Sequence, residues 1–417
     1  MTSSIPWFGR PLVSEPSRWT VTGLLDEIAD IGRDSERGGY SRHGLDDAEL
    51  SLRAWFIGKA EALGLTVSTD ADTNIWAWWG EPGPGAIATG SHLDSVPGGG
   101  SLDGPLGVVS GLVAVARLRE KTHQPPRPLA LVVFVEEEGG RFGMPCLGSR
   151  LAGGILAPSA ARALADREQI GFADALASAG HDPQLLGPVE WVNQLAAFIE
   201  LHVEQGRGLI DLGQPLAIAS AVRPHGRWRL EYTGEGNHAG TTLLADRHDP
   251  VLPMAAAVLA ARRLAGEAPD AVATVGRLSV IPGGTNVIAS KATAWLDVRA
   301  EQNEVVQSVV TGVIEAAELS ALQEGCGFSW QRESWTPRVE FDDQLRAAMH
   351  RALGQQVPEL STGAGHDAAV LAEVAPTGMI FVRNPTGASH TPAESASAED
   401  CELGAVVLAG VLEGLLK

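Results

Sequence analysis

Cysteine is scarce in this chain, and its scarcity narrows the classes of protein to consider. Cys146, Cys326 and Cys401 are the three cysteines among 417 residues, and none belongs to a Cys-x-x-Cys pair. Disulfide scaffolds and cysteine-rich zinc sites need clustered cysteines, so the sequence excludes both. Because this usage is typical of a reducing compartment, we expect a cytoplasmic protein.

Basic residues are also few. The chain has 31 Lys and Arg against 51 Asp and Glu, a formal net charge of −20 at pH 7. This charge repels nucleic acids and anionic membranes, so we expect neither as a partner. No uncharged apolar run reaches the length of a membrane span, and residues 1–12 contain no apolar segment typical of a signal peptide. An anionic small substrate is compatible with the charge only if a local Arg binds it.

The first third of the chain alternates between helical and extended patterns. A helix is predicted for residues 46–63, with Asp46 as its N-cap and Leu50 and Ala54 on its core-facing side. Next come a strand at 86–89, a helix at 104–120 and an almost wholly apolar strand at 129–135. Strand, helix and strand over this length form a βαβ unit, whose right-handed crossover makes the two strands parallel.

The pattern changes near Ala219. Residues from there to 336 predict strand, helix, two strands, helix and strand, at 227–233, 250–266, 271–280, 287–299, 304–322 and 327–333. This order is that of a split βαβ, ferredoxin-like α+β domain. The sequence therefore predicts an α/β protein in which a mostly parallel-sheet catalytic domain, 1–218 and 337–417, contains an inserted smaller domain, 219–336.

Histidine and acidic side chains follow the predicted strands of the βαβ unit. His92 follows the first strand, Asp103 precedes the helix, and Glu136, Glu137 and Glu138 follow the second strand. His92 and Asp103 taken singly are also typical of a strand end and a helix N-cap. Three adjacent acids at a sheet edge repel one another unless a cation is present, which favours a metal site over a solvated cluster. Since neighbours in extended chain point in opposite directions, one Glu can bind metal while the next accepts a proton.

Two further histidines complete a set of ligands for two divalent ions. His202 follows an apolar strand candidate, and taken alone a buried structural histidine is the favoured interpretation. His390 lies on a turn-rich loop, where a functional role is favoured. His238 and His366, both in glycine-flanked loops, stay ambiguous, and we interpret the other histidines as surface residues.

Seven short motifs resemble those of the M20 metallopeptidase-like clan, within it the allantoate amidohydrolases and N-carbamoyl-L-amino-acid hydrolases. They are Gly-Ser-His-Leu-Asp-Ser (90–95), Asp-Gly-Pro-Leu-Gly-Val (103–108), Glu-Glu-Glu-Gly-Gly-Arg-Phe (136–142), Glu-Leu-His-Val-Glu-Gln-Gly (200–206), Asn-His-Ala-Gly-Thr-Thr (237–242), Gly-Ala-Gly-His-Asp-Ala (363–368) and Ser-His-Thr-Pro-Ala-Glu (389–394). The fourth motif is specific to this branch, because peptidase members usually carry a carboxylate at the position of His202.

The resemblance implies a role for each candidate near the metal. Five residues match ligands of two divalent ions. Asp103 matches the ligand that both ions share. His92 and His202 match the other ligands of one ion, and Glu138 and His390 those of the second. Glu137 matches the general base, which takes a proton from water and passes it to the leaving nitrogen. The ions would be Zn²⁺ or Mn²⁺, with Co²⁺ or Ni²⁺ as alternatives.

The resemblance also implies that the inserted domain is a lid and a dimer interface. Its His238, Asn286 and Arg299 match residues that hold the substrate carboxylate or the developing oxyanion, some of them from the partner subunit. Gln205 and the backbone at Gly365 match further substrate contacts. Asn286 precedes Arg299 by 13 residues (299 − 286), so we expect its amide to lie beside the guanidinium.

We therefore expect a homodimeric binuclear metal amidohydrolase that cleaves a ureido or carbamoyl C–N bond in a small carboxylated substrate, with allantoate as first choice. An N-carbamoyl-L-amino-acid hydrolase, of the L-carbamoylase or β-ureidopropionase type, is the close alternative. Residues 383–386 differ from the segment found in many carbamoylases, so the motifs do not separate the two. His202 argues against a dipeptidase, and the intact ligand set argues against a non-catalytic metal-binding protein of the same fold.

Overall fold

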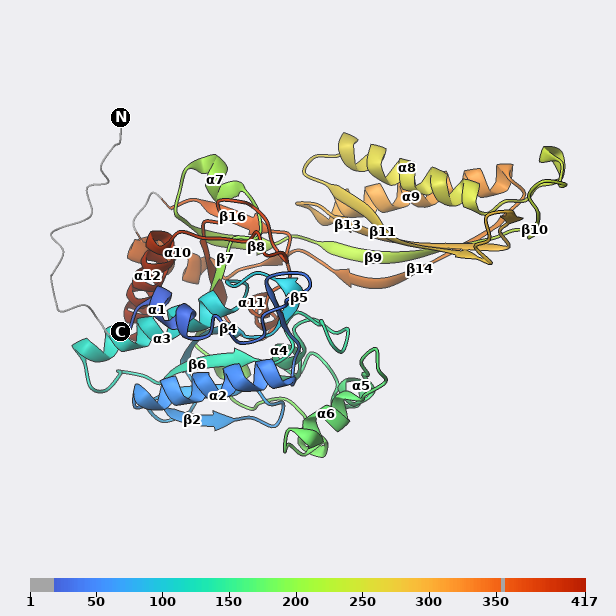
Figure 1. The fold of residues 1–417 in the computed structure, drawn as a ribbon. Helices are drawn as coiled ribbons and strands as arrows, with labels where there is room; N and C mark the ends of the chain where they lie inside the picture. The colour runs from blue at the N-terminus through green and yellow to red at the C-terminus, as the bar shows by residue number, and fades with distance from the viewer. Residues whose placement is uncertain (1–18, 354–356) are drawn as a thin grey trace. The chain divides into compact units, whose positions relative to one another are not determined.

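The computed structural model describes residues 19–353 and 357–417 (Figure 1). The expectation that residues 1–12 do not form a signal peptide concerns residues outside these two ranges. The chain divides into two compact units. Unit 1 consists of Met1–Ile218, Asp342–Pro358 and His366–Lys417, and unit 2 of Ala219–Phe341 and Glu359–Gly365.

Unit 1 is built on a mixed sheet. The strand order is β8 (Leu216–Val222), β17 (Thr377–Val382), β7 (Ala197–Val203), β4 (Ile87–His92), β6 (Leu129–Phe134), β3 (Ile75–Trp79) and β2 (Thr66–Thr69). The four strands from β17 to β6 are parallel, which confirms the predicted βαβ unit. The prediction of a mostly parallel sheet is wrong at both edges, where β8, β3 and β2 run antiparallel to their neighbours. The short connection between β2 and β3 allows only a hairpin, because a parallel pair needs a long crossover.

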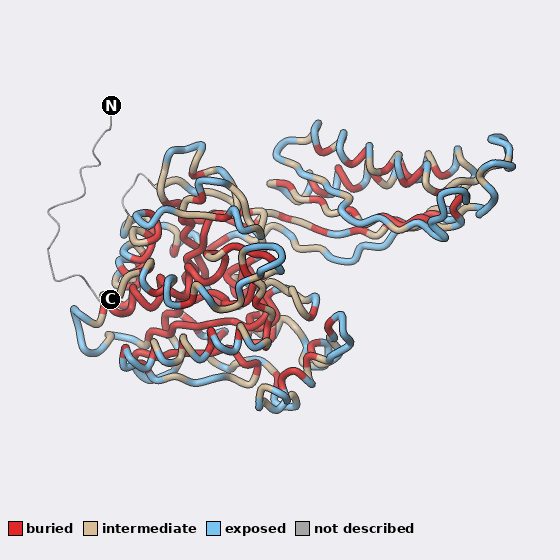
Figure 2. The backbone as a smooth tube through the Cα atoms, viewed as in Figure 1, coloured by how far each residue is buried: buried red, intermediate tan, exposed pale blue. Residues whose placement is uncertain are grey.

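Helices cover both faces of this sheet. One face carries α1 (Val21–Glu27), α2 (Asp47–Ala62), α3 (Pro105–Lys121), α10 (Asp343–Leu353) and α12 (Ala398–Leu416), packed on aliphatic strand residues. The opposite face carries the aromatic side chains of Trp76, Trp78, Phe134 and Phe198, together with α4 (Leu147–Ala152) and α11 (Asp367–Leu371). Figure 2 shows the central strands and most of α3 as buried, as expected of a sheet covered on both sides.

The remaining elements of unit 1 are short. They are β1 (Tyr40–Arg42), which pairs with β5 (Ser95–Gly99), α5 (Pro158–Arg162), α6 (Phe172–Ser178), α7 (Gly208–Leu212), and the 3₁₀ turns η1 (Pro183–Leu185) and η2 (Val192–Gln194). They connect the larger elements at the periphery of the sheet.

Helix α2 forms where the sequence predicts it, but its buried side differs. The Asp46 carboxylate caps the helix by accepting a hydrogen bond from the N–H three residues later, at 2.8 Å. Leu50 and Ala54, expected to face the core, are exposed, whereas Leu52 and Phe56 are fully buried. The predicted stripe was wrong because a second apolar stripe, offset by two residues, meets the sheet.

Unit 2 has the element order strand, helix, strand, strand, helix, strand. The elements are β9 (His225–Thr233), α8 (Val251–Glu267), β11 (Val272–Ile281), β13 (Lys291–Arg299), α9 (Asn303–Gln323) and β14 (Gly327–Thr336). The antiparallel sheet order is β11–β13–β9–β14, and α8 and α9 lie side by side on one face of it (Figure 1). A two-stranded ribbon of β10 (Asn237–His238) and β12 (Val287–Ile288) extends from this sheet. The 3₁₀ turn η3 (Leu244–Asp246) follows β10 in the chain. Two short strands, β15 (Val339–Glu340) and β16 (Glu359–Thr362), pair with β8.

Helix α9 is long and apolar enough to span a membrane by length and composition, the one such helix in the described part of the chain. A core helix meets the same criteria. Val306, Val309 and Val313 of α9 pack in the core of unit 2 with Leu230 and Ala292 of the sheet. These buried residues are those expected of a core helix.

Candidate metal centre

Two buried imidazoles stand at the ends of neighbouring parallel strands. His92 ends β4 and His202 lies near the end of β7, and both rings are almost fully buried. The Nδ1 atom of His92 lies 3.0 Å from the carbonyl oxygen of Asp94, and Nδ1 of His202 lies 2.9 Å from that of Val203. Because a carbonyl can only accept, Nδ1 carries the proton in both rings and Nε2 offers a free lone pair.

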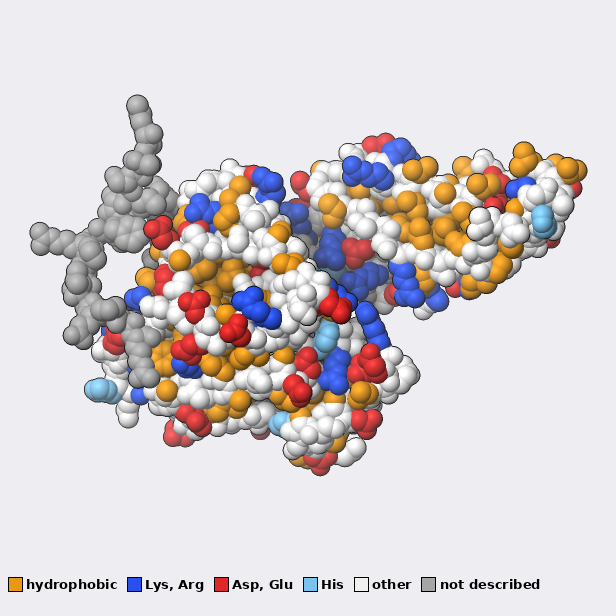
Figure 3. Space-filling view, viewed as in Figure 1, with side chains coloured by type: hydrophobic (Ala, Val, Ile, Leu, Met, Phe, Trp, Pro, Cys, Tyr) orange, Lys and Arg blue, Asp and Glu red, His pale blue; other side chains and the backbone are white. Residues whose placement is uncertain are grey.

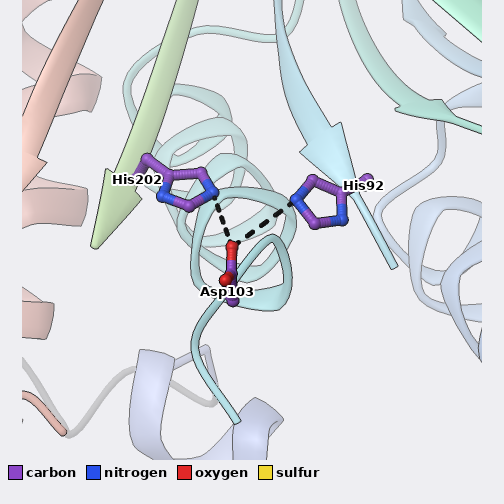
Figure 4. Close-up of side chains that lie close together, drawn as sticks. All are labelled: His92, Asp103 and His202. Carbon is purple, nitrogen blue, oxygen red and sulfur yellow. Dashed lines mark ion pairs between the residues drawn. The ribbon is translucent and has the colours of Figure 1, made fainter. Parts of the chain in front are cut away.

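The Asp103 carboxylate lies between two groups of possible ligands. Its Oδ1 atom is 3.8 Å from Nε2 of His92 and 3.3 Å from Nε2 of His202 (Figure 4). Its Oδ2 atom is 3.4 Å from Nε2 of His390, and that nitrogen is 3.3 Å from Oε2 of Glu138. All five predicted ligands therefore meet around one carboxylate, in one set of two histidines and another of a histidine and a glutamate.

The spacing and bonding of these atoms fit two bound cations. Two ligand atoms each about 2.1 Å from one tetrahedral ion are about 3.4 Å apart, close to the separations measured here. Nε2 of His92, Nε2 of His202 and Oε1 of Glu138 are buried and have no hydrogen-bond partner among the described residues. Buried polar atoms without partners are costly unless a ligand satisfies them. A metal ion on each side of Asp103 would do so.

The three consecutive glutamates have different surroundings. Glu136 is a structural carboxylate, because it accepts hydrogen bonds from the N–H groups of Gly44, Arg141 and Phe142. Glu137 directs Oε2 toward Nε2 of His92, at 3.7 Å, and Glu138 faces the other ligand group. Glu137 and Glu138 lie in a bend beyond the end of β6, after Glu136 with its positive φ of +52°, so the expected extended backbone is wrong here, although the two side chains still face different groups.

Burial and mutual repulsion control the charges in this cluster. Burial raises the pKa of Glu137 well above its usual range, and burial with the nearby Asp103 carboxylate raises the pKa of Glu138 to about 8. Burial opposes ionisation of Asp103 too, but His202 and the other imidazoles outweigh it and lower its pKa. A set of acids held this close favours a cation among them, because positive charge stabilises their ionised forms.

Gly104 is needed to bring Asp103 and His92 together. It has a φ of +84° at the start of α3, a conformation that side chains other than glycine rarely adopt. A Cβ atom there would lie within 2.7 Å of three atoms of the His92 ring. Both constraints require glycine between the carboxylate and the helix.

Two residues of this site were not singled out from the sequence, and a third was left ambiguous. Asp94 accepts the N–H groups of Glu137 and Glu138, each at 3.1 Å, and so fixes their backbone. Glu394 accepts the N–H of Asp103 at 3.0 Å. His366, left ambiguous above, is buried with its ring 4.6 Å from that of His202. The signals were present, since Asp94 follows His92 by two residues and Glu394 ends the His390 motif, but spacing alone does not show which backbone a carboxylate supports.

The predicted substrate contacts fall in both units. In unit 1, Gln205 donates hydrogen bonds from Nε2 to Oδ2 of Asp103 and to Oγ of Ser389, both at 2.9 Å. In unit 2, Arg299 donates to Asp297 at 2.9 Å and to the carbonyl oxygen of Gly363 at 2.6 Å, two residues before Gly365.

The expectation that Asn286 lies beside Arg299 is wrong within one chain. His238 and the residue after Asn286 pair in the β10–β12 ribbon, beyond the Lys291 end of β13. Arg299 ends β13 at its other end, and nine residues of extended chain span roughly 27 Å. The segment between Asn286 and Arg299 contains β12, a short break and the whole length of β13, and β13 separates the two side chains.

Comparison with known proteins places the chain among hydrolases. Peptidase family M20/M25/M40 matches residues 88–414. The chain is 35% identical to an N-carbamoyl-L-amino acid amidohydrolase of Geobacillus stearothermophilus, over 92% of this chain and 95% of the relative. It is also 35% identical to a ureidoglycolate hydrolase of Oryza sativa subsp. japonica, over 92% of this chain and 82% of the relative. The crystal structure of a hydantoinase/carbamoylase family amidase from Burkholderia vietnamiensis has a TM-score of 0.83 and 29% identity, covering 95% of this chain and 96% of that one.

Proposed function

Since the chain belongs to peptidase family M20/M25/M40 and is an amidohydrolase within it, we propose that it cleaves a ureido or carbamoyl C–N bond with two divalent metal ions. The substrate is a small carboxylated compound, with allantoate as the first to test. The position of Asp103 carries this proposal. Its two oxygens face separate ligand groups, as a carboxylate shared by two ions would.

Each residue of the centre then has a task. When bound, two divalent ions supply Lewis acidity, which acidifies water and polarises the substrate carbonyl. His92, His202, Glu138 and His390 would hold the ions together with Asp103. Glu137 accepts the proton of the attacking water at Oε2, the oxygen that faces His92, and returns it to the leaving nitrogen.

The separation of the substrate contacts in unit 2 supports a homodimer. Arg299 and Gly365 share one end of the unit, whereas His238 and Asn286 lie at the other, so one copy is not expected to bring all four to one substrate. In a dimer the second pair serves the partner's substrate. Unit 2 then acts as the lid and the interface, as the motif resemblance implies.

Unit 2 also has the surface for such an interface. Figure 3 shows hydrophobic side chains gathered along it. Leu259 of α8 and Leu319 and Leu322 of α9 are 71%, 58% and 78% exposed. Exposed apolar side chains on adjacent helices favour association with a second copy. We propose that this dimer works in the cytoplasm.

Hydrolysis of allantoate tests the substrate and the metals together. The purified protein should release ammonia from allantoate, lose activity after treatment with a chelator, and regain it with Mn²⁺, Zn²⁺, Co²⁺ or Ni²⁺ to differing degrees. A dipeptide serves as the control and should not be cleaved. Full turnover by protein shown to be metal-free by elemental analysis would refute the binuclear proposal.

An N-carbamoyl-L-amino acid is the second candidate substrate. The 35% identity with the Geobacillus stearothermophilus amidohydrolase favours it, and the equal identity with the rice enzyme adds ureidoglycolate to the same panel. Values of kcat/KM for the three compounds decide among them. Turnover of a carbamoyl amino acid with none of allantoate would replace the first choice and leave the reaction class unchanged.

A further inference from the structure

The backbone of Cys146 is hydrogen-bonded to the backbone of Glu137, the proposed general base. It stands before α4, is 3% exposed, and has a φ of +54°. Its N–H donates to the carbonyl oxygen of Glu137 at 2.6 Å, and the next two N–H groups donate to those of Glu136 and Val135 at 3.1 and 2.9 Å. These three successive hydrogen bonds fasten residues 146–148 to the segment that carries Glu137.

The thiol of Cys146 also contacts the carboxylate. Its Sγ atom lies 3.3 Å from Oε1 of Glu137 and donates a hydrogen bond to it. Burial, and then the charge of Glu137, raise the pKa of this thiol, so it keeps its proton and remains a donor. The other oxygen, Oε2, faces Nε2 of His92 at 3.7 Å. The two oxygens of Glu137 therefore have different partners.

We infer that Cys146 is a positioning residue for Glu137, whose thiol holds Oε1 and leaves Oε2 as the oxygen that transfers the proton. This inference rests on the proposed role of Glu137 as the base. The last torsion of a glutamate side chain is broad and has no strong preference of its own. A hydrogen bond to one oxygen fixes it, and proton transfer requires the accepting oxygen within hydrogen-bond reach of the water.

Variants of Cys146 test the donor directly in the metal-loaded protein. Cys146→Ala removes the thiol, and kcat should fall about tenfold, the effect of losing one hydrogen bond to a charged group. KM and the metal content should stay unchanged, because Cys146 touches neither ligands nor substrate contacts. Cys146→Ser keeps a donor and should restore most of kcat. Cys146→Gly also lacks the donor and suits the positive φ, so it replaces the Ala variant if that protein does not fold.

Cys401 supplies the matched control. It is equally buried, at 3% exposure, but lies in α12, away from Glu137. Cys401→Ala should leave kcat within about twofold of the wild type, because a core substitution that contacts no catalytic group changes the stability of the protein rather than its rate. A kcat loss as large as that of Cys146→Ala would mean that any buried cavity has this effect, and would overturn the inference.

Glu137→Gln separates failure of this inference from failure of the proposed function. If Glu137→Gln keeps wild-type kcat, the base is misassigned and both fall. If it is impaired while Cys146→Ala is not, or while Cys146→Ser is as impaired as Cys146→Ala, only the role of Cys146 falls. In the double variant, Cys146→Ala should add little to the loss, since residues acting through one another are not additive. A fully additive loss would contradict the inference.

Discussion

Replacing Asp72 by Asn should stabilise the protein, and the gain should grow with pH. Asp72 lies in the turn between β2 and β3 and is fully buried. Its Oδ1 atom accepts the N–H of Gly187 at 2.9 Å, while Oδ2 has no hydrogen-bond partner within the described ranges. Burial, and then the charge of Asp70, raise the pKa of Asp72 from 3.8 to about 7. An Asn side chain keeps the shape and the acceptor without the charge.

The size of the gain follows from this pKa. Below about pH 4 the carboxyl is protonated in the folded and the unfolded chain alike. Between about pH 4 and pH 7 the unfolded chain releases the proton while the folded chain keeps it, so the free energy of unfolding falls by about 1.4 kcal/mol per pH unit. Over about three units the wild type loses about 4 kcal/mol, which the Asn variant does not lose. We expect an advantage near zero at pH 4 and about 2–4 kcal/mol at pH 8.

Urea unfolding of both proteins at pH 4.5 and pH 8 measures this difference. The midpoint of Asp72→Asn should exceed that of the wild type clearly at pH 8 and only slightly at pH 4.5. Asp26→Asn removes an exposed carboxylate and should shift the midpoint little at either pH. An equal gain at both pH values, or a loss at pH 8, would refute the assignment of a buried ionised carboxylate to Asp72.

Three further predictions concern the base, the lid and a helix cap. Glu137→Gln should keep both metals and lower kcat about 10²–10⁴-fold, whereas Glu138→Gln should lose metal first, as elemental analysis and initial rates will show; the reverse pattern would exchange their roles. Arg299→Leu should lower kcat/KM for carboxylated substrates about 30-fold or more with unchanged metal content, and wild-type kcat/KM would end its part in recognition. Asp46→Ala should cost about 1 kcal/mol in urea unfolding by removing the α2 cap, and an unchanged midpoint would contradict the capping.

The elements with strong periodicity and clear ends could be predicted from the sequence. The α3 pattern, with Pro105 in its first turn, gave the helix and the parallel pairing of β4 with β6. Residue types and their positions beside strands and helices predicted His92, Asp103 and Glu138, and the structure places His92 and Glu138 in the two ligand groups that contain Asp103. Each of these features depends on residues close together in the sequence, so the sequence pattern predicts it.

Other features depend on partners far along the chain. The buried side of α2 was misjudged because Leu50 and Phe56 lie on two competing apolar stripes, and only the sheet decides between them. The antiparallel pairing of β3 with β6 was missed because Ile75–Trp79 is apolar throughout, and a short apolar run does not show in which direction its strand runs. The position of Asn286 relative to Arg299 depended on whether the intervening residues form a strand or a turn, which a separation of 13 residues does not decide.

Gly104 limits how the centre can tolerate mutation. Its positive φ and the His92 ring leave no room even for a methyl group, so the restriction applies to every other amino acid regardless of polarity. In a saturation library, active clones at position 104 should all encode glycine. Exposed Leu50, by contrast, should accept most side chains. The codon for the residue between Asp103 and α3 is thus fixed by backbone conformation and space, whatever the site binds.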